Sequence, residues 1–141
     1  MNKFLPFHLA IPVHNLEECR VFYRDILGCT EGRSSEHWVD FNFFGHQLVI
    51  HYSKKTSDQK SNSNPVDGKN VPVPHFGAVL EMDTFKTFSE ALQEKNITFI
   101  IEPYTRFKGQ SGEQSTMFFK DPSGNALEFK AFKNLNQLFA K

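Results

Sequence analysis

The chain has no net charge, because its 16 Lys and Arg residues balance 16 Asp and Glu residues. It also has no basic stripe of the kind that nucleic acids and anionic membranes attract, so we expect neither as a partner. No apolar run approaches the roughly 20 residues that a membrane-spanning helix needs. The apolar N-terminal stretch is broken by Pro6, His8 and Pro12 and has no small-residue cleavage site, which favours a strand over a signal peptide. These absences predict a soluble, cytoplasmic protein.

Cysteine is scarce as well. Cys19 and Cys29 are the two copies, and their separation matches no metal-binding motif, so we expect two reduced thiols. The sequence contains neither an HxxxH nor a CxxC motif. Local spacing alone therefore indicates no metal site, and any such site must combine residues that lie far apart in the chain.

Phenylalanine is abundant, with 16 copies in 141 residues, and this number suggests sheet faces packed against helices within one domain of ordinary size. Alternating and helical apolar patterns predict the same order of elements twice, a strand, a helix and three strands. The first copy comprises strand 7–13, helix 16–27 and strands 29–34, 37–43 and 46–53; the second comprises strand 74–82, helix 84–95 and strands 98–102, 115–120 and 125–132.

The repeat predicts an α+β fold of two βαβββ modules related by a pseudo-twofold axis. FHLAIPV opens the first copy and HFGAVLE opens the second. Module one is expected at about 5–53 and module two at about 74–133, with a short C-terminal helix at about 134–141. The segment between the modules, about 54–73, is polar and without an apolar period, so we interpret it as a loop or linker.

Three polar side chains occupy corresponding places in this repeat. His8 and His75 lie near the start of the first strand of each copy, and Glu128 lies on the last strand of the second copy, opposite Leu127 and Phe129. Related copies would bring these strands around one concave sheet. Two imidazoles and a carboxylate on rigid strands suit a divalent first-row metal ion that keeps open positions for water and substrate.

Each of these residues has a plainer interpretation when it is taken alone. A single histidine in a sheet is more often a hydrogen-bonded core residue than a ligand. Glu128 can equally be an edge-strand residue in water or half of a structural ion pair. The in-phase placement of all three residues favours the metal site. His51 faces the same way on the fourth strand, and its position fits an edge residue as well as a site residue.

Several stretches carry a family resemblance: FHLAIPV followed by NLEECRVFYRDILG, PHFGAVLEMD, and FFKDPSGNALEF. From Phe7 to Phe132 the chain resembles the vicinal oxygen chelate superfamily, which includes glyoxalase I, extradiol dioxygenases, and fosfomycin- and bleomycin-resistance proteins. The resemblance implies paired βαβββ modules in a U-shaped, partly open mixed sheet around a cleft, often in a homodimer. It also implies ligands at His8, His75 and Glu128 for a divalent ion (Fe, Mn, Ni or Zn), and a small-molecule substrate.

The resemblance leaves the chemistry open between several members. Glyoxalase I-like sequences carry a Glu where His51 falls, although an imidazole can still ligate a metal or move a proton. His46 in GHQLVI matches the acid/base histidine of extradiol dioxygenases, whereas Phe118 stands where those enzymes usually carry Tyr. Strict alternation puts His46 and His51 on opposite faces, so His46 needs the Gly45 turn to redirect it. The sequence favours an extradiol-type dioxygenase with His46 and His51 as catalytic candidates.

Other members of the superfamily remain as alternatives. One is a glyoxalase I-like lyase or isomerase, and another is a metal-free binding protein of the bleomycin-resistance type. A thiol transferase of the fosfomycin-resistance type is a third, and no clear set of its phosphonate-binding residues is visible in the sequence.

Substrate contacts are predicted from two places in the chain. The loop that begins at Tyr104 contains Arg106 and Lys108, which can meet an anionic group, although a solvated surface loop explains the same residues. Trp38 alternates with buried positions on the third strand and is predicted to line the cleft.

Overall fold

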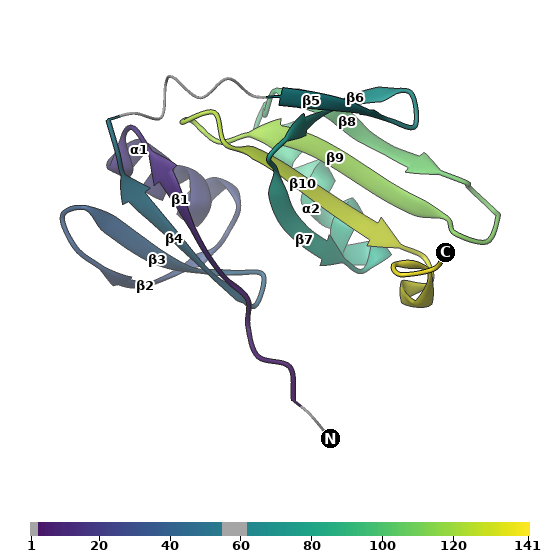
Figure 1. The fold of residues 1–141 in the computed structure, drawn as a ribbon, viewed down its shortest axis with the longest axis horizontal. Coiled ribbons are helices and arrows are strands. Elements are labelled where there is room, and N and C mark those ends of the chain that lie inside the picture. The colour runs from purple at the N-terminus through teal and green to yellow at the C-terminus, as the bar shows by residue number, and fades with distance from the viewer. Residues whose placement is uncertain (1–2, 55–61) are drawn as a thin grey trace. The chain divides into compact units, whose positions relative to one another are not determined.

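The computed structural model describes residues 3–54 and 62–141 of the chain (Figure 1). The chain divides into two compact units, which we describe separately. The first consists of the N-terminal part up to residue 60 together with Asp121–Asn125, and the second consists of residues 61–120 and 126–141. This division places residues 62–73 with the second unit and the Asp121–Asn125 turn with the first.

The first unit contains a helix on a four-stranded sheet. Its strands are β1 (His8–Val13), β2 (Thr30–Ser34), β3 (Trp38–Phe43) and β4 (His46–Tyr52), in the order β1-β4-β3-β2. β1 runs parallel to β4, and the other pairs are antiparallel. Between β1 and β2 the chain forms α1 (Leu16–Val21), which the Asn15 side chain caps, and continues as the π-helical segment η1 (Phe22–Ile26).

The second unit repeats this arrangement. Its strands are β7 (Phe76–Leu80), β8 (Phe99–Arg106), β9 (Gln114–Lys120) and β10 (Ala126–Phe132), in the order β7-β10-β9-β8. Helix α2 (Met82–Glu94) packs on β10 and β9, and a short 3₁₀ segment, η3 (Leu135–Gln137), follows β10. The matching strand orders confirm the expectation of two βαβββ modules, each with a mixed sheet.

Alternation along the strands sorts apolar from polar side chains in both sheets. In β4, Leu48 and Ile50 are buried, and in β10, Leu127 and Phe129 are fully buried. Phe129 stacks on Phe119 of β9 with 5.8 Å between ring centroids. Each sheet therefore buries one face, and residues such as Gln47 and Glu128 belong to the other face.

The turn Asp121–Asn125 is fixed within the first unit by one buried carboxylate. Asp121 accepts hydrogen bonds from the backbone N–H groups of Ser123 and Asn125, from the Asn125 amide and from the Tyr23 hydroxyl. Burial raises the pKa of Asp121, although these donors oppose the shift. Burial also raises the pKa of Tyr23. Asn125 further donates to the Pro12 carbonyl at 2.9 Å, so the conspicuous DPSGN motif has a structural role.

The segment between the modules differs from the prediction. Residues 55–61 of the expected 54–73 loop lie outside the described residues, but β5 (Asn62–Val66) and β6 (Lys69–Val73) form an antiparallel hairpin. Its turn residues Asp67 and Gly68 have φ angles of 49° and 78°, as a type I′ hairpin turn requires. The two strands are mostly exposed and lack apolar alternation, so their sequence does not indicate strands. The Asp67–Gly68 pair, which is typical of a hairpin turn, was the feature that could have predicted the hairpin.

Two element boundaries were also wrong. α2 begins at Met82, before the predicted start of the helix at residue 84. β8 continues to Arg106 instead of ending at residue 102, so Tyr104 and Arg106 of the predicted loop are paired with β9. Both errors have the same cause. Polar residues that lie inside the helix or strand were interpreted as marking its end.

No helix in the described ranges combines the length and the hydropathy that a membrane crossing requires. The longest, α2, has 13 residues.

Candidate metal centre

His75 and Glu128 meet in the second unit because β7 and β10 are neighbouring parallel strands. Glu128 lies opposite Gly77, and His75 immediately precedes β7. The His75 Nε2 atom is 3.0 Å from Glu128 Oε2. A Cβ atom on Gly77 would collide with the backbone carbonyl of Glu128, so only glycine permits this close approach of the strands. The sequence therefore brings two of the three predicted ligands into contact.

Hydrogen bonding fixes which nitrogen of His75 carries a proton. His75 Nδ1 lies 2.6 Å from the carbonyl oxygen of Pro72. A carbonyl oxygen only accepts, so Nδ1 must donate and Nε2 holds the lone pair in the neutral ring. Phe118 packs edge-on against the imidazole, with ring centroids 5.1 Å apart. A carbonyl on the distal nitrogen is the arrangement that orients metal-ligating histidines.

The facing atoms of His75 and Glu128 both carry lone pairs when the imidazole is neutral, so both can be donors to one cation. The 3.0 Å separation of Nε2 and Oε2 is short enough for both atoms to bind one divalent first-row ion at about 2.1 Å from each.

The second oxygen of Glu128 is held by other groups. Thr116 Oγ1 donates to Glu128 Oε1 at 2.9 Å, and Lys130 Nζ lies 3.6 Å from the same oxygen. The Glu128 side chain is 14 % exposed. These contacts leave Oε2 to face His75, so the carboxylate is oriented before any metal arrives.

His8 of the first unit has an equivalent hydrogen-bond arrangement. Gln47 lies opposite His8 in the sheet, and its Oε1 is 2.8 Å from His8 Nδ1. The amide nitrogen of Gln47 donates to Asp40 Oδ2 at 3.4 Å, and a carboxylate only accepts. This donation orients the amide so that Oε1 faces His8. His8 Nδ1 therefore carries the proton, and Nε2 keeps its lone pair.

His75 and Glu128 of the second unit are donors of the types that divalent first-row ions take, an imidazole with an open Nε2 atom and an oriented carboxylate. His8, with its own open Nε2 atom, belongs to the first unit. Among the described residues, no group of three or more His, Cys, Asp or Glu side chains is placed to hold a metal ion.

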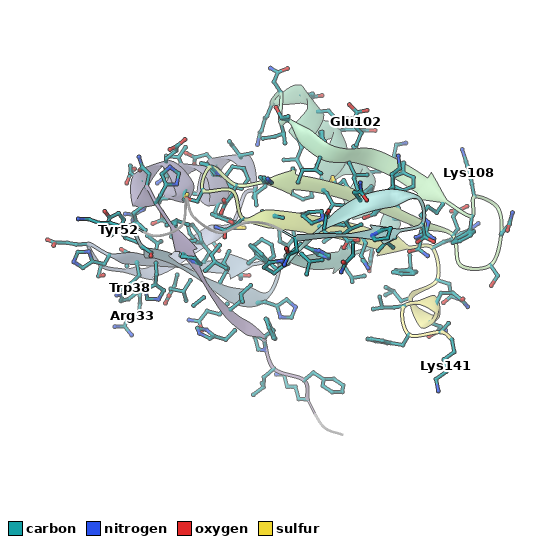
Figure 2. All side chains as sticks on the ribbon, turned by 45° about the horizontal axis from the view of Figure 1, so that its top comes forward. Arg33, Trp38, Tyr52, Glu102, Lys108 and Lys141 are labelled. Atoms are coloured by element: carbon teal, nitrogen blue, oxygen red, sulfur yellow. The ribbon has the colours of Figure 1, made fainter. Side chains whose placement is uncertain are left out.

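The two predicted catalytic histidines lie at different positions of β4. His46, its first residue, accepts a hydrogen bond at Nδ1 from the Phe7 N–H at 2.9 Å. The neutral ring therefore carries its proton on Nε2. His51 lies opposite Trp38 and on the same face as Gln47. The Arg33 guanidinium lies 5.7 Å from the centre of the Trp38 ring, and Figure 2 labels both residues at one end of the first unit.

A cavity of about 230 Å³ opens beside His75 and Glu128 within the second unit. Val71, Ile101 and Phe118 form its apolar side, with Tyr104 packed against them. Its polar side contains the residues around Glu128 and the cations Lys69, Arg106 and Lys130. An apolar surface with a few converging polar groups is typical of a small-molecule site.

The predicted substrate contacts of the second unit fall into two cavities. Arg106 and Tyr104 line the cavity beside His75. Lys108, in the loop after β8 (Figure 2), lines a separate cavity of about 340 Å³ near α2, which Tyr104 also borders.

Among the polar and charged residues that line the His75 cavity, those missed from the sequence are Asp67, Lys69, Gln114, Thr116 and Lys130. Lys130 is two residues beyond Glu128 on the same strand, so alternation alone was enough to find it. Asp67 and Lys69 belong to the segment interpreted as a loop.

Comparison with known proteins identifies the family. Residues 6–129 match the model of the Glyoxalase/Bleomycin resistance protein/Dioxygenase superfamily. A solved glyoxalase/bleomycin resistance protein/dioxygenase from Alicyclobacillus acidocaldarius is 32 % identical, with a TM-score of 0.77, over 95 % of this chain and 96 % of that one. No curated protein matches the chain.

More distant structures share the fold. The fosfomycin resistance protein of Listeria monocytogenes is 18 % identical, with a TM-score of 0.69, over 97 % of this chain and 98 % of that one. The lactoylglutathione lyase of Agrobacterium tumefaciens is 17 % identical, with a TM-score of 0.66, over 100 % of this chain and 98 % of that one. The resemblance drawn from the sequence motifs is thus confirmed, and the chain belongs to the glyoxalase/bleomycin resistance protein/dioxygenase superfamily.

Proposed function

We propose that the protein is a divalent-metal-dependent enzyme that acts on a small oxygenated substrate, with His8, His75 and Glu128 as the metal ligands. The observation that carries this proposal is the shared arrangement of the two histidines, whose Nδ1 atoms are both occupied by oxygen acceptors. Both Nε2 lone pairs are then left for a metal. A bound ion would act as a Lewis acid toward adjacent oxygens of the substrate.

The surrounding residues have separate parts in this proposal. Thr116 keeps Glu128 in its ligating orientation, and Phe118 excludes water from one side of His75. His51 is proposed to move a proton or to act as a fourth ligand. Arg106 and Tyr104 are proposed to contact the substrate; the same role for Trp38 and Lys108 remains a prediction from the sequence.

Within the superfamily we favour an extradiol-type dioxygenase, because two imidazoles and one carboxylate are the ligand set of non-haem Fe(II) oxygenases. His46 enters this reaction as an acid, because Nδ1 is occupied by the Phe7 N–H. Oxygen uptake with catechols and Fe(II) tests the assignment. A chain that is silent there but converts methylglyoxal and glutathione with Ni or Zn is instead a glyoxalase I-like lyase.

Metal analysis of the purified protein tests the ligand set. We expect one divalent ion per chain in the wild type and its loss from His8→Ala, His75→Ala and Glu128→Gln. His37→Ala is the control, because His37 precedes β3 and belongs to no proposed ligand set. Absence of metal from every preparation, with small-molecule binding intact in Glu128→Ala, would contradict the enzyme and support a bleomycin-resistance-type binding protein.

We further propose that the protein is a cytoplasmic homodimer. Phe4, Leu5 and Phe7, which precede β1, are largely exposed in the single chain, and exposed apolar groups of this kind favour association. Light scattering should then give twice the 16.3 kDa of one chain, and a single-chain mass at micromolar concentration would contradict the dimer.

A further inference from the structure

The cavity beside His75 contains more positive than negative side chains. Lys69, Arg106 and Lys130 line it, against Asp67 and Glu128. Glu128 is already engaged by His75 and Thr116. Asp67 is thus the remaining carboxylate of the lining, and a divalent ion would increase the positive excess. A low-dielectric cavity with this balance favours an anionic ligand.

Asp67 is paired with the arginine of this cavity. Arg106 Nη1 lies 2.6 Å from Asp67 Oδ2, and the side chains are 21 % and 46 % exposed. Arg106 ends β8, whereas Asp67 is the first turn residue of the β5–β6 hairpin. An ion pair this open to solvent contributes little free energy, so a better-placed anion can replace its carboxylate.

The hairpin that carries Asp67 is mostly exposed. Every residue of β5 is exposed, and in β6 Val71 packs into the apolar cluster with Ile101 and Phe118. Lys69 Nζ lies 5.4 Å from the centre of the Tyr104 ring. A two-stranded hairpin is marginally stable by itself, so the turn can give way at low cost when Arg106 exchanges its partner.

We propose that the ligand of this cavity carries an acid group, a carboxylate or a phosphate, that Arg106 binds, and that the Asp67 carboxylate occupies the place of this group in the ligand-free protein. Binding then exchanges one carboxylate partner of Arg106 for another anion, without any covalent change. Arginine suits this part because its planar guanidinium matches both kinds of acid group. The proposal rests on the proposed function in taking this cavity as the substrate site.

Titration of the metal-free full chain with benzoate, inorganic phosphate and neutral benzamide, followed by ¹H–¹⁵N NMR at constant ionic strength, tests the exchange. We expect benzoate or phosphate to bind and benzamide to bind at least tenfold more weakly. Arg106→Met should weaken anion binding at least tenfold, and Arg106→Lys should restore part of it. The control for charge loss is Lys86→Met, on α2 beside the other cavity, which should change affinity less than twofold.

The Asp67→Asn variant distinguishes replacement of the Asp67 carboxylate by the ligand from general attraction of an anion to the cavity. Loss of the competing carboxylate should tighten anion binding about two- to fivefold, which is what an exposed ion pair is worth. Glu102→Gln removes the same charge from an exposed position on β8 (Figure 2) and should leave the affinity unchanged. Equal effects of Asp67→Asn and Glu102→Gln, or weaker binding in Asp67→Asn, would overturn the exchange.

Other outcomes decide the remaining points. Whichever of benzoate and phosphate binds more tightly identifies the acid group. Equal losses in Arg106→Met and Lys86→Met would show nonspecific attraction and overturn the proposal. Because this titration needs no metal, its failure alongside a full metal complement would remove only the anion site. Anion binding in a chain that never takes up metal would remove only the proposed enzyme.

Discussion

At the scale of single residues, the candidate site is defined by hydrogen bonds that fix protons and orientations. The Nδ1 atom of His8 donates to an amide oxygen, and that of His75 donates to a backbone carbonyl. In both rings the Nε2 atom therefore keeps its lone pair. Glu128 is oriented through one oxygen, which leaves the other to face His75. A metal site of this kind depends on the residues behind its ligands as much as on the ligands.

Thr116→Val is expected to weaken metal binding without unfolding the protein. The change removes the hydroxyl that donates to Glu128 Oε1, and loss of such a supporting bond typically costs about 10- to 100-fold in metal affinity. Competition with a chromogenic chelator measures the affinity. Thr105→Val is the control, because its hydroxyl bonds Ser115 on the neighbouring strand. Equal affinities in the two variants would show that Thr116 does not position the ligand.

The two thiols should resist alkylation in the native protein. Burial raises the pKa of Cys19 to about 11 and that of Cys29 to about 12, so at pH 8 both are almost entirely neutral thiols. Only the thiolate reacts, and its fraction rises about tenfold per pH unit below the pKa. Mass spectrometry after iodoacetamide treatment should show slow labelling that accelerates with pH, and two labels per denatured chain. Rapid labelling at pH 8 would contradict the burial.

At the scale of elements, the sequence was sufficient wherever apolar alternation was strong. Both modules and the phase of Glu128 follow from it, because buried faces determine register. The β5–β6 hairpin was missed because its strands bury little and its Asp67–Gly68 turn was the only signal. Asp67 and Lys69 belong to this hairpin and were missed for the same reason. Their partners, Arg106 and Tyr104, were predicted as substrate contacts.

Gly77→Ala should damage the β7–β10 pair that joins His75 to Glu128. Its Cβ atom would collide with the Glu128 carbonyl, and forced overpacking costs about 1–3 kcal/mol. Urea denaturation measures the loss, and metal affinity should fall with it. Gly32→Ala is the control, because its Cβ would meet Asp40 at 3.4 Å, an ordinary contact. A stability of Gly77→Ala within about 0.5 kcal/mol of the wild type would contradict the collision.

At the scale of the whole molecule, the fold and the family are established while the chemistry is proposed. Chains of this fold include a lyase and a fosfomycin resistance protein, so the fold alone selects no reaction. The hydrogen-bond states of the ligands could not be predicted from the sequence, because Pro72 and Gln47 are identified as acceptors only by distances. The combination of the three ligands was predicted from their phase in the repeat and remains a proposal.

Anomalous diffraction from crystals grown with Co²⁺ tests the central claim most directly. The account predicts one strong peak within about 2.0–2.3 Å of His8 Nε2, His75 Nε2 and a Glu128 oxygen. A peak bound by other residues, or one that lacks any of these three atoms, would contradict it.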